Sequence, residues 1–210
     1  MAKPSYVPED VNTYFDPDLG YIISDTAIVS PGGILEYLTS PCNGRTITGI
    51  SGSYTWPNVT STQALTTTYE DVTGSSISYT PPAGTKTVLY RFVWQIDVTA
   101  NSGISHYKFR LDGTEVIPAY RSLAPGEYVT NQHHNANEIF EWAIQCDADA
   151  DDKANGKLAS WTVPKNLKLE AREYSSTYQQ ELHKNTWRDA AGASAPYILA
   201  VPTLTIIATG

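Results

Sequence analysis

Residues 88–98 alternate between apolar and more polar side chains over eleven positions, and this pattern restricts the fold of the chain more than any other feature. Every second position is apolar: Val88, Tyr90, Phe92, Trp94, Ile96 and Val98. Successive side chains of a strand point to opposite faces, whereas a helix would spread the same residues around its circumference. The pattern therefore predicts a long antiparallel-type strand with one face on a core. The opposite face is mixed, because it combines Leu89 and Val93 with polar residues.

The same alternation recurs in four further segments, which predicts a series of half-buried strands. Their apolar members are Tyr107, Phe109 and Leu111 in 105–111; Phe140, Trp142, Ile144 and Cys146 in 139–146; Leu167, Leu169 and Ala171 in 167–171; and Leu204, Ile206 and Ala208 near the C-terminus. Asp112-Gly113 is a strong hairpin signal, because both turn residues tolerate positive φ. Residues 173–187 are ambiguous, because Tyr174, Tyr178 and Leu182 fit helix spacing and also share one strand parity; the lack of a helix cap favours another long strand over a helix. The expected fold is an all-β, antiparallel sandwich or barrel.

The acidic balance of the chain argues against a nucleic-acid partner. Its net charge is −8 at pH 7, and its fourteen lysines and arginines are scattered singly, whereas phosphate contacts need clustered cations. No run approaches the roughly 20 apolar residues of a membrane-spanning helix, and the N-terminus has no apolar signal-peptide core. We therefore expect no membrane partner and folding in a cytoplasm. Cys42 and Cys146 are expected to be free thiols, Cys146 on the core face of its strand.

The acidic loop after residue 146 has the wrong residues for a calcium site. Asp147, Asp149 and Asp151 imitate the start of a calcium-binding loop. Asp152 and Leu158, however, stand where such a loop requires its turn glycine and its bidentate glutamate. A solvated hairpin loop is the preferred interpretation, and we expect no metal.

The remaining polar residues do not suggest catalysis. His133 and His134 are adjacent, so in an extended segment their rings point to opposite faces and do not share a metal ion. Glu141 and Glu170 would form a glycosidase pair only if the fold brought them together, and solvated strand faces are the expected place for both. The sequence contains no nucleophile elbow and no phosphate-binding loop. We predict no enzymatic activity and no cofactor.

Residues 1–29 differ in composition from the rest of the chain. Pro4, Pro8 and Pro17 exclude a regular helix and a central strand there. We predict an extended N-terminal docking arm over 1–29, followed by one domain over 30–210; an arm packed on its own domain is the alternative. Spaced aromatic residues would anchor this arm on a partner: Tyr6, Tyr14, Phe15 and Tyr21.

Aromatic usage is skewed towards tyrosine and tryptophan, with fourteen Tyr and five Trp against four Phe. These side chains combine an apolar body with a polar group and are enriched at protein–protein interfaces. Part of the excess is typical of β-proteins in general. The remainder indicates an extensive interface.

Four segments resemble virion proteins of marine and cyanobacterial tailed bacteriophages. They are Cys42–Thr55 (CNGRTITGISGSYT), Ser75–Tyr90 (SSISYTPPAGTKTVLY), Leu169–His183 (LEAREYSSTYQQELH) and Pro202–Ala208 (PTLTIIA). The resemblance covers roughly residues 30–210 and leaves the arm outside. It implies a tumour-necrosis-factor-like jelly roll that assembles as a homotrimer, located in the virion after synthesis in the host cytoplasm. Candidate trimer-interface residues are Leu89, Val93, Tyr174 and Tyr178.

Two functions are compatible with this resemblance. The first is a capsid decoration (cement) protein, whose arm binds the major capsid protein or another virion protein. The short chain favours it, because fibres usually need a long shaft, for which this chain has no room. The second is a receptor-binding tail fibre or spike tip, in which Trp56 and Trp187 would stack on host glycan.

Overall fold

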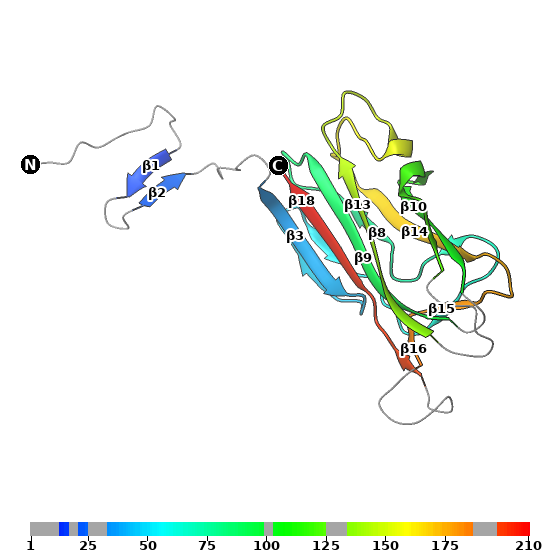
Figure 1. Ribbon diagram of the computed structural model, residues 1–210. Helices are drawn as coiled ribbons and strands as arrows, with labels where there is room; N and C mark the ends of the chain where they lie inside the picture. The colour runs from blue at the N-terminus through cyan, green and yellow to red at the C-terminus, as the bar shows by residue number, and fades with distance from the viewer. Residues whose placement is uncertain (1–12, 17–20, 25–32, 99–102, 125–133, 187–196) are drawn as a thin grey trace, which may run out of the picture.

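The fold is known from a computed structural model of the chain. It describes residues 33–98, 103–124, 134–186 and 197–210, and the backbone of the strands β1 (Thr13–Asp16) and β2 (Tyr21–Ser24). Two larger antiparallel sheets face each other in the body of the protein (Figure 1). The prediction of an all-β, antiparallel sandwich is confirmed.

The first sheet is built around β9 (Thr87–Val98), the strand predicted from the alternation at 88–98. Its main order is β3 (Ile34–Pro41), β18 (Thr203–Thr209), β9 and β13 (His134–Gln145). β13 pairs with β9 over its whole length, from His134↔Val98 to Gln145↔Thr87. The short strands β15 (Gln180–Leu182) and β6 (Gln63–Ala64) extend this sheet beyond the start of β18.

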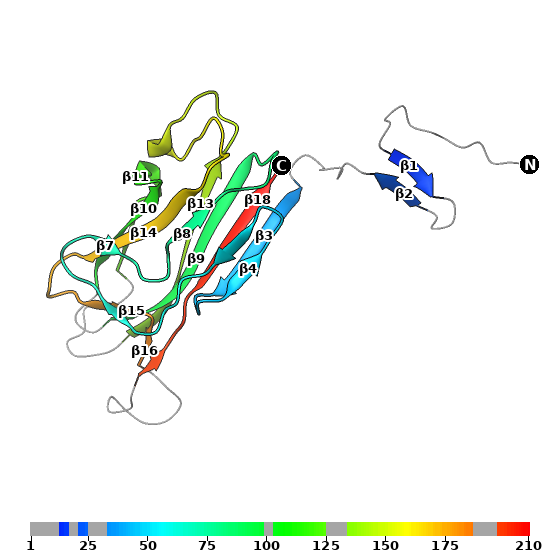
Figure 2. The same cartoon turned by 180° about the vertical axis from the view of Figure 1, so that it is seen from behind.

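The second sheet is built around β10 (Ser105–Leu111) and β14 (Lys165–Glu173), which pair along their length. One edge of β10 pairs with β11 (Thr114–Glu115) and β12 (Arg121–Leu123). The far edge of β14 pairs with β7 (Glu70–Asp71) and β8 (Ile77–Tyr79). Figure 2 shows β7, β8, β14 and β10 from behind.

The connectivity of these strands is that of a jelly roll. We number the principal strands in chain order as β3, β8, β9, β10, β12, β13, β14 and β18. The first sheet then runs 1-8-3-6 and the second runs 2-7-4-5. Strands adjacent in the sequence thus lie mostly in opposite sheets, as expected for two interlocked Greek keys.

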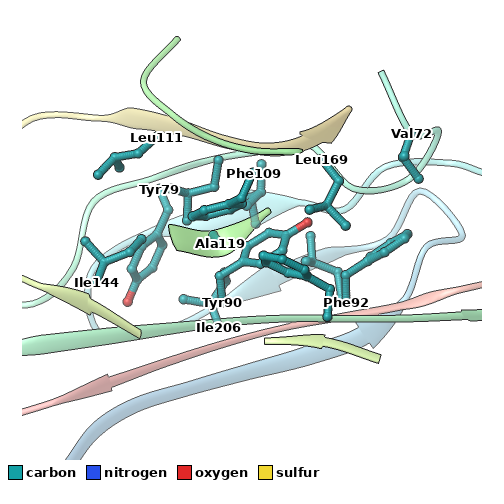
Figure 3. Close-up of a cluster of buried hydrophobic side chains, with 14 of the residues drawn as sticks. Val72, Tyr79, Tyr90, Phe92, Phe109, Leu111, Ala119, Ile144, Leu169 and Ile206 are labelled. Atoms are coloured by element: carbon teal, nitrogen blue, oxygen red, sulfur yellow. The ribbon is translucent and has the colours of Figure 1, made fainter. Parts of the chain in front are cut away.

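Aromatic side chains from both sheets fill the core between them (Figure 3). Tyr90 of β9 packs on Phe109 of β10 with ring centroids 4.9 Å apart, and Phe109 packs on Phe140 of β13 at 5.4 Å. The buried Tyr90 hydroxyl donates to the Ser75 carbonyl at 2.7 Å, which satisfies its polar group. The apolar parity of 88–98 is therefore the core face, as predicted.

Shorter elements complete the described chain. β4 (Thr46–Thr48) pairs with β5 (Ser53–Thr55), and β16 (Lys184–Asn185) pairs with β17 (Ile198–Leu199). The described residues contain two short 3-10 helices, η1 (Ile117–Ala119) and η2 (Lys153–Asn155). Within those residues, no helix has the length and apolarity needed to cross a membrane.

The predicted Asp112-Gly113 hairpin is confirmed. Asp112 and Gly113 have φ of 52° and 81°, and Leu111 pairs with Thr114 across the turn. Two positive φ angles match the twist of the flanking strands, and glycine and aspartate tolerate them best.

The predicted long strand over 173–187 is wrong. β14 ends at Glu173, and a turn closed by the Tyr178 amide on the Ser175 carbonyl (2.9 Å) leads to β15. A second break follows at His183, whose φ is 62°. β14 buries odd-numbered residues, β15 buries even-numbered ones, and the two strands belong to different sheets, so the shared parity of Tyr174, Tyr178 and Leu182 does not mark one continuous strand face.

The N-terminal segment is not simply extended. β1 and β2 pair antiparallel with each other, from Thr13↔Ser24 to Asp16↔Tyr21. The prolines do not prevent this pairing, because none lies inside either strand and Pro17 comes directly after β1. Tyr6 lies outside the described residues.

Candidate subunit interface

The outer face of the first sheet carries two apolar rows separated by a polar one. Each row crosses the four strands β3, β18, β9 and β13 in register. The first row is Tyr37–Ile207–Leu89–Ala143, the middle row is Thr39–Thr205–Arg91–Glu141, and the third row is Pro41–Thr203–Val93–Ile139. We call these three rows the outer-sheet surface.

The apolar rows hold large side chains in contact with water. Tyr37 and Ile139 are each 56% exposed, at opposite edges of the surface. Leu89, Val93 and Ile207 lie between them and are half-buried. Two of these residues, Leu89 and Val93, are predicted interface residues; Tyr37, Ile139 and Ile207 were not. The sequence could have indicated them, because each is an apolar residue at a position of its strand whose side chain points away from the core.

The middle row is internally paired, so it adds little net charge. The Thr39 and Thr205 hydroxyls lie 2.7 Å apart, and Arg91 Nε lies 3.1 Å from Glu141 Oε1. Both members of this ion pair are about half-exposed, so the pair stabilises the isolated chain only weakly. The result is a charge-balanced surface with an apolar row on each side of the polar one.

A strand edge without a strand partner among the described residues borders this surface; at its end, Gln145 exchanges backbone hydrogen bonds with Gly156 and Leu158. β13 is twelve residues long, and among the described residues its one strand partner is β9. A long strand with one free edge exposes a row of unpaired amide and carbonyl groups, which proteins normally cover or block. A partner subunit on this side would cover both the edge and the apolar rows.

The other two predicted interface residues lie elsewhere. Tyr174 follows β14 and packs against His106 of β10, with ring centroids 6.1 Å apart, on the outer face of the second sheet. Tyr178 lies in the next turn, 5.8 Å from Tyr174. The structure therefore brings Leu89 and Val93 together but places the two tyrosines in a separate cluster.

The glycan-stacking prediction for Trp56 is wrong. Trp56 is 1% exposed, and its Nε1 donates to the Leu204 carbonyl at 3.0 Å. A buried ring offers no face to a sugar, and the sequence pattern missed this because Trp56 comes directly after β5, in a short segment without alternation. Trp187 lies outside the described residues.

Of the predicted arm anchors, Tyr14 and Phe15 fall in β1 and Tyr21 begins β2.

Sequence reasoning also missed a buried carboxylate. Glu36 of β3 is 4% exposed, and its oxygens accept hydrogen bonds from the Ser51 amide (2.8 Å), the Ser51 hydroxyl (2.6 Å) and the Tyr79 hydroxyl (2.7 Å). Burial, followed by the Glu36 carboxylate, raises the pKa of Tyr79 well above its usual range. These bonds fasten the turn between β4 and β5 to the sandwich. Their role is structural, because both carboxylate oxygens of Glu36 accept hydrogen bonds from groups within the protein.

The carboxylates considered for catalysis are paired with cations. Glu141 pairs with Arg91, and Glu170 lies 2.8 Å from Arg110 on the other sheet. In the acidic loop, Asp151 accepts the Ala159 amide at 2.8 Å. Within the described residues, no group of three or more His, Cys, Asp or Glu side chains could hold a metal ion.

Both cysteines are buried free thiols, as expected. The Cys42 thiol donates to the Gly74 carbonyl at 3.3 Å, and the Cys146 thiol to the Ile144 carbonyl at 3.5 Å. Burial raises the pKa of each thiol to about 12. Neither thiol is therefore an activated nucleophile.

Comparisons with known proteins assign no family. No protein-family model and no curated protein matches the sequence. Among the solved structures that match is one described as "Structure of infectious bursal disease virus Gt strain", with a TM-score of 0.23 and 15% sequence identity. The match covers 79% of this chain and 43% of that chain, so this protein spans less than half the length of the matched chain.

Proposed function

We propose that this protein is a structural component of a bacteriophage particle, in which its jelly roll forms a homotrimer and its N-terminal arm attaches the trimer to the capsid. The observation that carries the proposal is the outer-sheet surface, with half-buried Leu89, Val93 and Ile207 between the exposed Tyr37 and Ile139. The resemblance of residues 30–210 to tailed-phage virion proteins supplies the biological setting.

The outer-sheet surface suits a permanent interface between copies of the chain. Such interfaces have an apolar centre with few unpaired charges, and here the ion pair Arg91–Glu141 is already formed within the chain. Cyclic assembly by a head-to-tail contact would place the β13 side of one copy against its neighbour and so cover the free edge. Three-fold closure is the expectation from the virion resemblance.

The local structure at 13–24 supports attachment through the arm. Among the described residues, β1 and β2 pair with each other and not with either larger sheet. An isolated two-stranded hairpin is marginally stable in water and gains stability by packing on something else. In a trimer, three such hairpins would bind a symmetric lattice with avidity if all three reached their sites.

Decoration is favoured over a fibre-tip role because Trp56, one of the two proposed sugar-stacking residues, is buried. Quantitative mass spectrometry of purified virions would separate the two. Many copies per particle, comparable with the number of capsomers, support decoration. A handful of copies would contradict decoration and favour a fibre or spike.

Size-exclusion chromatography with light scattering tests the trimer. The wild-type chain should have three times the monomer mass of 23.0 kDa, and Val93→Asp should run as a monomer. Val163→Asp is the matched control, because Val163 is 57% exposed and lies outside the outer-sheet surface, so it should leave the trimer intact. A wild-type monomer at micromolar concentration would contradict the proposal.

A further inference from the structure

Three aromatic rings lie side by side on the outer face of the second sheet. His106 of β10 is stacked near Tyr120, with ring centroids 5.9 Å apart and planes inclined by 29°, and its other neighbour is Tyr174 at 6.1 Å. Tyr174 is 55% exposed and Tyr120 is 40% exposed. Rings of this size in water, gathered at one place, are typical of a binding surface rather than of a free strand face.

Among the described residues, one arginine beside these rings forms no ion pair with a carboxylate. Three other cations on this face form ion pairs: Lys108 with Glu115, Arg110 with Glu170, and Lys168 with Asp71. Arg172 lies across the register from His106, and its guanidinium sits over the Tyr69 ring, 5.4 Å from the centroid. No described carboxylate forms an ion pair with Arg172, although the chain as a whole is strongly acidic.

Polar atoms border the rings. The Tyr69 and Tyr120 hydroxyls lie 3.5 Å apart, and His106 Nδ1 lies 2.9 Å from the Ser122 hydroxyl. Burial, and then the charge of Arg172, lower the pKa of His106, which favours the neutral ring. A neutral imidazole can donate through one nitrogen and accept through the other, as can the hydroxyls around it.

We propose that Tyr120, His106, Tyr174 and Arg172 form a binding site for an acidic saccharide, a sugar that carries a carboxylate. The exposed tyrosine faces would contact the C–H face of a sugar ring, while His106 and Ser122 hydrogen-bond to its hydroxyls. The planar fork of Arg172 matches a carboxylate in bidentate geometry. Tyr69 is a positioning residue, because it holds the guanidinium from one side without facing the ligand.

This site goes beyond the proposed attachment function and does not depend on it. The aromatic cluster and the outer-sheet surface lie on the outer faces of the two opposed sheets (Figures 1 and 2), so the two proposals rest on different residues. The Arg172 guanidinium, which forms no ion pair with a described carboxylate, suits one carboxylate, whereas a polyphosphate such as nucleic acid would need a cluster of cations.

The test uses the full chain and two soluble probes, a tetramer of mannuronic acid and the neutral mannose tetramer. Binding is followed by isothermal titration or by the NMR shifts of tyrosine side chains. We expect the acidic tetramer to bind with a Kd of about 1 mM or tighter and the neutral one about tenfold more weakly, because charge-assisted hydrogen bonds account for the difference. Arg172→Gln should reduce binding of the acidic tetramer to the level of the neutral one, and Arg172→Lys should give an intermediate value.

Two matched variants control for general surface effects. Arg45→Gln removes another exposed arginine and Tyr197→Ala removes another tyrosine that is about half-exposed, and neither should change binding. Tyr174→Ala should weaken both probes, since it removes a stacking face and no charge.

Three results would overturn the proposal: no saturable binding, equal binding of acidic and neutral probes, or equal loss in the control variants. Displacement of the acidic tetramer by equimolar sulfate would also overturn it, because it would show a simple anion site. Light scattering on the same samples distinguishes failure of the saccharide proposal from failure of the trimer proposal. A trimer that binds no saccharide overturns this inference alone.

Discussion

Trp56 and Leu204 are joined by a buried hydrogen bond, 3.0 Å from the indole Nε1 to the backbone carbonyl, although they lie 148 residues apart in the chain. The bond ties the segment after β5 to β18 of the first sheet. It also places one tryptophan of the sequence in the core, where its ring packs with no access to solvent.

Replacing Trp56 by Phe should destabilise the fold, because it removes the donor and leaves a small cavity. We expect a loss of about 2–4 kcal/mol in the free energy of unfolding, measured by urea titration at fixed protein concentration. Trp142→Phe is the control: Trp142 is half-buried, and no partner of its Nε1 is found among the described residues, so its loss should cost less than about 1 kcal/mol. Equal losses in both variants would contradict a specific role for the Trp56 bond.

His183 should make the protein sensitive to mild acid. It is fully buried with φ of 62°, and its Nε2 donates to the Thr73 carbonyl at 2.9 Å because a carbonyl oxygen only accepts. Burial lowers the pKa of His183 to about 4, against 6.5 in the unfolded chain. Between these pH values the unfolded state binds more protons, so stability falls as the pH drops from 6.5 to about 4. The loss amounts to about 3 kcal/mol.

Urea titrations at several pH values check this dependence. His183→Asn should be less stable at pH 7, because it loses the ring that packs edge-on against Phe92, yet its stability should change less between pH 6.5 and 4. Asparagine is suitable because it tolerates positive φ. The pKa of His106 is also lowered, so the pH dependence of stability is measured for His106→Gln as a comparison. If wild type and His183→Asn lost stability in parallel, His183 would not be the group responsible.

Both cysteines should be unreactive in the folded protein. With a pKa of about 12 for each thiol, roughly 1 in 10,000 is ionised at pH 8, and both are buried. A thiol-titrating disulfide reagent should detect almost none in the native state and two per chain in denaturant without reductant. Fewer than two after denaturation would indicate oxidation.

Deleting residues 1–25 should separate attachment from assembly. The shortened protein should remain a trimer with unchanged melting behaviour, because β1 and β2 pair only with each other in the described structure. It should fail to add to particles that lack the protein. Tyr14→Ala combined with Phe15→Ala in the full chain should weaken attachment severalfold or more, since buried aromatic residues dominate many interfaces.

Two outcomes would contradict this assignment. Attachment by the truncated trimer would show that the jelly roll itself binds the particle. Unfolding of the truncated chain would show that residues 1–25 belong to the folded domain. Co-sedimentation with particles and thermal melting distinguish the two.

The sequence alone determined the strands whose inner faces are apolar. β9, β10, β14 and β18 follow directly from two-residue periodicity, because burial of one face demands it whatever the partner strand is. The turn at Asp112-Gly113 was equally predictable, since positive φ at both positions is a local requirement. The outward position of Leu89 and Val93 came from the same parity.

Only the tertiary structure decided which residues meet across strands and sheets. Tyr37, Ile207 and Leu89 form one row because β3, β18 and β9 pair in a particular register, and long-range pairing leaves no mark in a single strand's sequence. Trp56 is buried because β18 passes beside it, and residues 173–187 break because the chain changes sheets there. Local periodicity thus fixes which face of each strand is buried, whereas packing between distant segments fixes what every outward residue contacts.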